Sequence, residues 1–105
     1  MKALVAGPDR GLAGALEAEG VTVTRIDGMV TREDMLDAGI EDADLYVLTD
    51  VAEATSVPVA LDDNPDLRIV IYAPETMPEF VRGQVDLALD PAVMAVEAVA
   101  EELAA

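Results

Sequence analysis

Short apolar runs alternate along the chain with stretches in which apolar residues recur every three or four positions. The runs have the length of strands that are buried on both faces, and the stretches between them have the period of amphipathic helices. This alternation predicts a single α/β domain over residues 1–105, with helices on both faces of a five-stranded parallel sheet in three layers. The strands are expected at residues 2–6, 21–26, 44–49, 68–73 and 85–89.

The second predicted strand differs from the others in its pattern. Residues 21–26 alternate strictly between apolar and polar side chains, as in a strand with one face exposed to water, whereas residues 44–49 are mostly apolar. The second strand is therefore expected at an edge of the sheet, in the doubly wound, flavodoxin-like order 2-1-3-4-5. The alternative is the Rossmann-like order 3-2-1-4-5, in which the third strand would lie at the edge.

Capping residues predict where the helices begin and end. The first helix is expected to begin at Pro8 or Asp9 and to end at Gly20, with Gly14 allowing close packing on the sheet. The second is expected between Thr31 and Gly39. Three further helices are expected to begin at Ser56, at Thr76, and at Asp90 or Pro91. The last of them has a predicted buried stripe made of Val93, Met94, Val96, Val99, Ala100 and Leu103.

The composition excludes several kinds of chemistry. The chain has no cysteine and no histidine, so it lacks thiolate chemistry, disulfides, the commonest general base and the commonest transition-metal ligand. No apolar run approaches the roughly 20 residues of a membrane span. No basic patch is present that could bind a nucleic-acid backbone. We therefore expect a cytoplasmic protein that binds neither membrane nor nucleic acid.

The charge balance indicates the kind of solvent in which the protein works. Twenty-two acidic residues stand against six basic ones, which gives a formal net charge of −16. An acidic surface on an ordinary Ala/Val/Leu core is typical of proteins from halophilic archaea. In molar salt the Debye length falls to roughly 3 Å, so that repulsion among the carboxylates is largely screened.

Ligands of open α/β sheets bind at the carboxyl ends of the strands, and polar residues follow four of the predicted strands. Asp9 and Asp50 are also candidate Mg²⁺ ligands, because hard cations prefer oxygen donors. Arg10 is the one cation of the group and is expected to pair with Asp9 or Asp50. The candidate ligand-binding residues are Gly7, Asp9, Arg10, Gly11, Asp27, Thr49, Asp50, Glu75 and Thr76.

Three segments resemble parts of two families with this fold: LAGALEAEGVTVTRID (12–27), NPDLRIVIYA (64–73) and VDLALDP (85–91). They look like response-regulator receiver domains and like the nucleotide-binding N domains of TrkA/RCK-type potassium-transport regulators. The functional residues of receivers are missing, because Thr49 stands in place of the phosphoacceptor aspartate and Asp90 in place of the lysine. The glycines at 7, 11 and 14 give G-x-x-x-G-x-x-G instead of the dinucleotide pattern, although Asp27 matches the position of a ribose-binding acid.

The whole chain is also similar to short haloarchaeal proteins of unknown function that often carry the label "CTP synthetase". That chemistry is not supported, because there is no phosphate-binding G-x-x-x-x-G-K-[ST] loop, no cysteine and only one lysine. We expect a non-catalytic regulatory or small-ligand-binding domain. The alternatives are a nucleotide-binding protein (NAD-type or pyrimidine nucleotide) and a carboxylate- or Mg²⁺-dependent enzyme. A cofactor, if one is bound, would be Mg²⁺ or a nucleotide.

The resemblance to receivers also implies a contact surface formed by the fourth helix, fifth strand and fifth helix. A homodimer or another protein partner would use an apolar strip there, made of Val81, Val85, Leu87, Val93 and Val96. Phe80, the only phenylalanine, is expected to be a core anchor beneath the short fourth helix.

Overall fold

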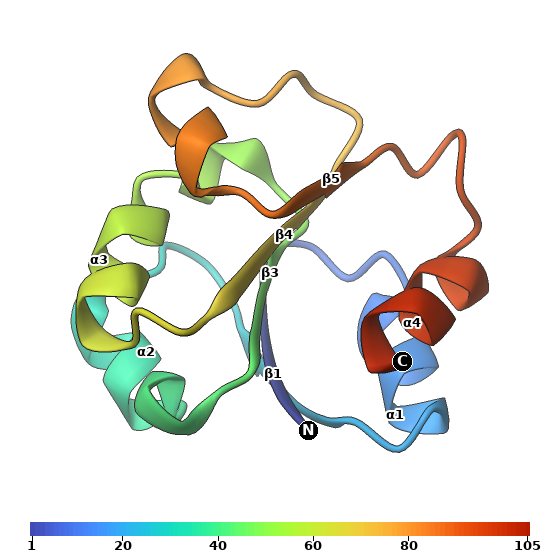
Figure 1. Ribbon diagram of the computed structural model, residues 1–105, viewed down its shortest axis with the longest axis horizontal. Helices are drawn as coiled ribbons and strands as arrows, with labels where there is room; N and C mark the ends of the chain where they lie inside the picture. Colours follow the sequence, from blue (N-terminus) through green and yellow to red (C-terminus); the bar gives the residue numbers. More distant parts are fainter.

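The computed structural model describes all residues, 1–105, and contains one five-stranded parallel sheet (Figure 1). Its order is β2-β1-β3-β4-β5, as the sequence predicts. The strands are β1 (Lys2–Ala6), β2 (Thr22–Ile26), β3 (Leu45–Leu48), β4 (Arg68–Tyr72) and β5 (Leu87–Leu89). In the edge strand β2 only Ile26 is buried, whereas every residue of β3 is buried. The prediction that the alternating residues 21–26 form an edge strand is therefore confirmed.

The helices form two outer layers (Figure 1). They are α1 (Leu12–Ala18), α2 (Arg32–Asp37), α3 (Ser56–Asp63) and α4 (Val96–Ala104), with 3-10 turns η1 (Ile40–Asp42), η2 (Val51–Glu53) and η3 (Glu79–Gln84). Helices α1 and α4 cover one face of the sheet, and α2, α3 and η3 cover the other. None of the helices is long and apolar enough to cross a bilayer.

Each face of the sheet has its own hydrophobic core, because neighbouring residues of a strand point to opposite faces. Tyr46 packs in the cluster beneath α2 and α3, and Val47 packs in the cluster beneath α1 and α4. The Tyr46 hydroxyl lies 2.7 Å from the Ser56 hydroxyl, which gives this buried polar group a partner. Burial raises the pKa of Tyr46 to about 12, so the phenol is not available as a base near neutral pH.

Several predicted helix boundaries are wrong, although the Thr31 cap is confirmed by a complete capping box with Asp34. Helix α1 begins at Leu12, after Pro8 and Asp9, because Gly7 and Gly11 adopt positive φ angles of 115° and 82° that interrupt a helix.

Two other predicted starts are also wrong, since η3 begins beyond Thr76, and α4 begins beyond Asp90 and Pro91. Helix α3 begins at Ser56 as predicted, but the Ser56 side chain makes no cap. The Ser56 hydroxyl binds Tyr46 and the Glu53 carbonyl oxygen. The Asp90 carboxylate accepts a hydrogen bond from the Ala92 backbone within a turn.

Three side-chain placements also differ from the expectation. Phe80 is 60% exposed and is not a core anchor, because Val81 is the residue of η3 that enters the core. Val93 is 85% exposed and lies outside the buried stripe, because it precedes α4. Gly14 is exposed, with open space where a Cβ would lie, so it does not serve close packing on the sheet.

Candidate functional site

The carboxyl ends of the strands carry two separate clefts. We call the first the β1–β3 cleft; it has a volume of about 270 Å³ and lies among the loops that follow β1, β2 and β3. We call the second the β4–β5 cleft; it has a volume of about 280 Å³ and lies between the ends of β4 and β5 and the segment that leads into η3. The candidate residues do not converge on one site, because five of them are divided between these two clefts and the others, Asp9, Arg10, Gly11 and Thr49, line neither.

The β1–β3 cleft is polar and carries three carboxylates. The carboxylate of Asp27 lies 3.3 Å from Arg25, Asp50 accepts a hydrogen bond from the Ala52 backbone at 2.9 Å, and Glu53 accepts one from the Val30 backbone at 3.2 Å. The lining consists of Gly7, Pro8, Asp27, Gly28, Asp50 and Glu53. Because each carboxylate already has a partner, these groups stabilise the surrounding loops.

The two candidate Mg²⁺ ligands do not line the same cleft. Asp9 lies outside the β1–β3 cleft and accepts a hydrogen bond from the Gly11 backbone at 2.8 Å. No group of three acidic side chains in the structure is arranged to hold a metal ion. Asp9 and Asp50 instead have the role of short polar residues that satisfy backbone donors in turns.

The loop after β1 is fixed by three side chains, Thr49, Arg10 and Arg25, which we call the β1-loop lock. The buried Thr49 hydroxyl lies 2.7 Å from the Pro8 carbonyl oxygen, to which it donates a hydrogen bond, and 3.3 Å from that of Ala6. The Arg10 guanidinium donates to the Thr49 carbonyl oxygen at 2.9 Å, so its predicted pairing with Asp9 or Asp50 is wrong. Arg25 donates to the Gly7 carbonyl oxygen, also at 2.9 Å.

Gly7 approaches the lock so closely that it leaves no room for a side chain. A Cβ added to Gly7 would lie 2.5 Å from the Thr49 hydroxyl oxygen and 3.1 Å from the Asp50 backbone nitrogen. The lack of a side chain at Gly7 therefore allows the loops after β1 and β3 to approach each other closely. Arg25 was not among the candidates, because a polar residue in an edge strand gives no sign that its guanidinium reaches a neighbouring loop.

The β4–β5 cleft holds the predicted residues Glu75 and Thr76, together with Arg82 and Asp90, which were not among the candidates. Its other lining residues are Ile71, Ala73, Pro74, Met77, Ala88 and Leu89. Arg82 lies in η3 and also pairs with Glu79 at 3.2 Å. A cation is brought to the strand ends only because the chain folds back through η3, which the sequence pattern alone did not indicate.

The β1 loop is poorly suited to bind a pyrophosphate. The Gly11 N–H already donates to the Asp9 carboxylate, and α1 has only seven residues. We therefore expect weak or no binding of NAD, ATP or CTP without metal. Titrations of each nucleotide with and without Mg²⁺, followed through backbone amide chemical shifts, check this prediction. Tight metal-free binding with shifts confined to residues 7–11 would contradict it.

Comparisons with known proteins agree with the observed fold. A family of unknown function, DUF7126, matches residues 3–103. A search of curated proteins found no significant match.

Three solved structures share the fold of the chain. An orphan response regulator of H. pylori is 14% identical with a TM-score of 0.74, and the match covers 98% of this chain and 92% of that one. A Burkholderia pseudomallei protein described as pilus assembly-related is 20% identical, with a TM-score of 0.69 and coverages of 98% and 86%. A Burkholderia thailandensis protein described as the pilus assembly protein CpaE is 19% identical, with a TM-score of 0.69 and coverages of 98% and 94%. At these identities the likeness concerns the receiver-like fold.

Proposed function

The chain belongs to the DUF7126 family of unknown function, and we propose that it is a non-catalytic regulatory domain that acts through contacts with a partner. The observation that supports this proposal best is the β1-loop lock. At the end of β3, where a receiver carries its phosphoacceptor, Thr49 is fully buried and bonded to the carbonyl oxygens of the β1 loop. A side chain in that state is held as a structural element and is not presented to a substrate.

The remaining polar groups at the strand ends support the same proposal. Asp50 and Asp27 in the β1–β3 cleft each have a partner within the protein, and Asp90 follows β5 where a receiver has its lysine. A phosphorylated carboxylate there would have no lysine to neutralise it. A carboxylate- or Mg²⁺-dependent enzyme and a nucleotide-binding protein are the alternatives to this proposal.

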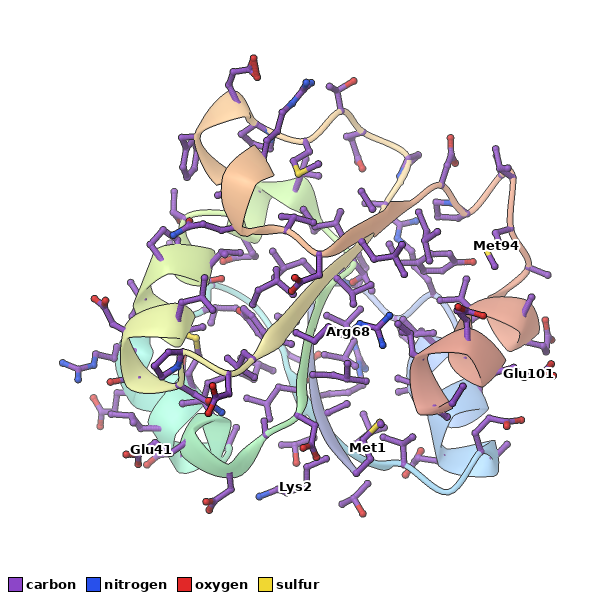
Figure 2. All side chains as sticks on the ribbon, viewed as in Figure 1. Met1, Lys2, Glu41, Arg68, Met94 and Glu101 are labelled. Atoms are coloured by element: carbon purple, nitrogen blue, oxygen red, sulfur yellow. The ribbon has the colours of Figure 1, made fainter.

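The proposed setting is the cytoplasm of a halophilic archaeon. The support is the ratio of 22 acidic to 6 basic residues in a chain with an ordinary apolar core. Only three carboxylates take part in ion pairs, and acids such as Glu41 and Glu101 point away from the body of the domain (Figure 2). Such a surface needs concentrated salt to screen its self-repulsion.

The proposed partner is a second copy of the chain, bound at the open edge formed by β5 and residues 90–96. Leu87 and Val96 are partly exposed there, and Val93 is 85% exposed. The other two members of the predicted strip lie apart from it, since Val81 is buried and Val85 packs on the opposite core. The proposed surface therefore covers Leu87, Leu89, Met94 and Val96, which pack on the α1–α4 side, together with the exposed Val93.

Light scattering in molar KCl tests this contact. We expect a mass twice that of the protomer, and a Val93→Glu variant whose dimer dissociates at least about tenfold more readily, because a charge would be buried against apolar side chains. Met29→Glu is the matched control, since Met29 is 79% exposed and lies in the loop after β2. A strict monomer at high protein concentration, or equal effects of the two variants, would overturn the proposed homodimer.

A further inference from the structure

The β4–β5 cleft combines an apolar wall with charged groups of both signs. Arg82 supplies a guanidinium, and Glu75 and Asp90 supply carboxylates at the rim. The β1–β3 cleft differs from it, because its charged lining is entirely acidic. The apolar wall consists of Ile71, Ala73, Met77, Ala88 and Leu89.

The polar groups of this cleft have unused hydrogen-bonding capacity. The side chains of Glu75 and Thr76, and the backbone N–H groups of residues 75–77, make no hydrogen bond within the protein. Asp90 uses one carboxylate oxygen for the Ala92 backbone at 2.8 Å, which leaves the other oxygen free. Arg82 pairs only with Glu79, and both side chains are mostly exposed, so this pair is weak enough to exchange for a ligand.

The size of the cleft limits what it can hold. A volume of about 280 Å³ corresponds to roughly nine water molecules at their liquid density. That space suits a small ligand of about eight or nine non-hydrogen atoms. Met77 is half-buried at the wall, and its flexible side chain can adapt to the shape of an apolar group.

The charges select among ligands of this size. A simple anion would place its charge beside the carboxylates of Glu75 and Asp90, and a simple cation would make no use of Arg82. A zwitterion has no net charge and satisfies both signs at once. We propose that the β4–β5 cleft binds a free α-amino acid with an apolar side chain. Its carboxylate meets Arg82, its ammonium meets Asp90 and Glu75, and its side chain lies on the apolar wall.

This inference deepens the proposed regulatory function and rests on it, since the amino acid would be the signal that the domain senses. The cleft and the proposed dimer surface share β5, and Leu89 belongs to both. A ligand that orders the end of β5 therefore also orders part of the surface at which the second copy binds.

Titration of the whole protein with L-leucine in molar KCl, followed through backbone amide shifts, tests the proposal. We expect saturable shifts at Glu75, Thr76, Ala88 and Asp90. Isocaproate lacks the ammonium group and isoamylamine lacks the carboxylate, and each is expected to bind at least about tenfold more weakly because it leaves charged groups without partners. The absence of saturable shifts with L-leucine, or equal affinity for isocaproate, would overturn the proposal.

Two cleft variants and one control variant separate recognition from stability. Arg82→Gln is expected to weaken L-leucine binding at least about tenfold, and Arg32→Gln, which removes the same charge from α2 outside both clefts, is expected to leave it unchanged. Asp90→Asn keeps an oxygen that can accept from the Ala92 backbone, so it tests the ammonium contact without disturbing the turn. Equal binding by the wild type and both cleft variants would contradict the assignment.

The same titration distinguishes the two proposals. Conversion of L-leucine into another compound, visible in the proton spectrum of the ligand, would contradict the non-catalytic function while leaving the binding site in place. A failure of L-leucine to bind would remove the ligand site, whereas the partner contact is decided separately by light scattering.

Discussion

Raising KCl from millimolar to molar concentration is expected to stabilise the protein by several kcal/mol and to raise its melting temperature by well over 10 °C. The reason is the unscreened repulsion among 22 carboxylates, of which only three lie within ion pairs. At low salt the Debye length approaches the size of the domain, whereas at about 1 M it is roughly 3 Å. For a domain of this size, 1 kcal/mol corresponds to roughly 4–8 °C in melting temperature.

Chemical denaturation with urea, at low and at molar KCl, measures this effect without adding further ions. Sorbitol at equal osmolality is the control, because it changes surface hydration without screening charge. A variant with four exposed acids neutralised (Glu33→Gln, Asp37→Asn, Glu97→Gln and Glu101→Gln) should lose part of the salt dependence. Equal midpoints at the two salt concentrations would show that the acids are already compensated locally.

Replacing Gly7 by alanine is expected to destabilise the protein by about 3 kcal/mol or more. The new Cβ would meet the Thr49 hydroxyl oxygen at 2.5 Å and the Asp50 backbone nitrogen at 3.1 Å, in a backbone with a φ of 115°. The positive φ alone costs about 1–2 kcal/mol for a residue with a side chain, and the displacement of the loop adds to it. Thr49→Val, which removes the hydrogen bonds to Pro8 and Ala6, is expected to cost about 1–3 kcal/mol.

Gly20→Ala is the matched control for this experiment. Gly20 also has a positive φ, 88°, but a Cβ there would lie in open space. Urea denaturation of both variants in molar KCl separates the cost of the backbone from the cost of the crowded contact. If Gly7→Ala and Gly20→Ala were equally stable, the close approach between the β1 and β3 loops would not be a structural feature of the domain.

The order of the sheet could be predicted from the sequence because it depends on which strands are covered on both faces. The alternation in residues 21–26 indicates a strand with one exposed face, whereas the uniformly apolar pattern of β3 indicates a strand buried on both faces. Helix starts were less predictable, because a residue such as Asp9 or Asp90 satisfies backbone donors equally well in a turn and at a helix cap. Whether such a residue lies in a turn or at a helix cap is decided by the backbone angles of the neighbouring residues.

The edge of the sheet at which the strands end could be predicted from the sequence, but the shape of the two clefts there could not. The carboxyl ends of the strands were identified correctly, because parallel topology places them at one edge of the sheet. The loop beside the first cleft is fixed by Thr49, Arg10 and Arg25, whose hydrogen bonds to carbonyl oxygens of distant loops leave no periodic signal. Arg82 reaches the second cleft through a 3-10 turn whose course the sequence pattern did not reveal.

The central claim is that a structural lock occupies the position where a receiver domain accepts phosphate. Intact-protein mass spectrometry after incubation with acetyl phosphate and Mg²⁺ in molar KCl tests it most directly. We predict an unchanged mass, because Thr49 is buried and the Asp50 carboxylate is bound to the Ala52 backbone. A mass increase of one phosphoryl group that is lost in an Asp50→Asn variant would contradict the account.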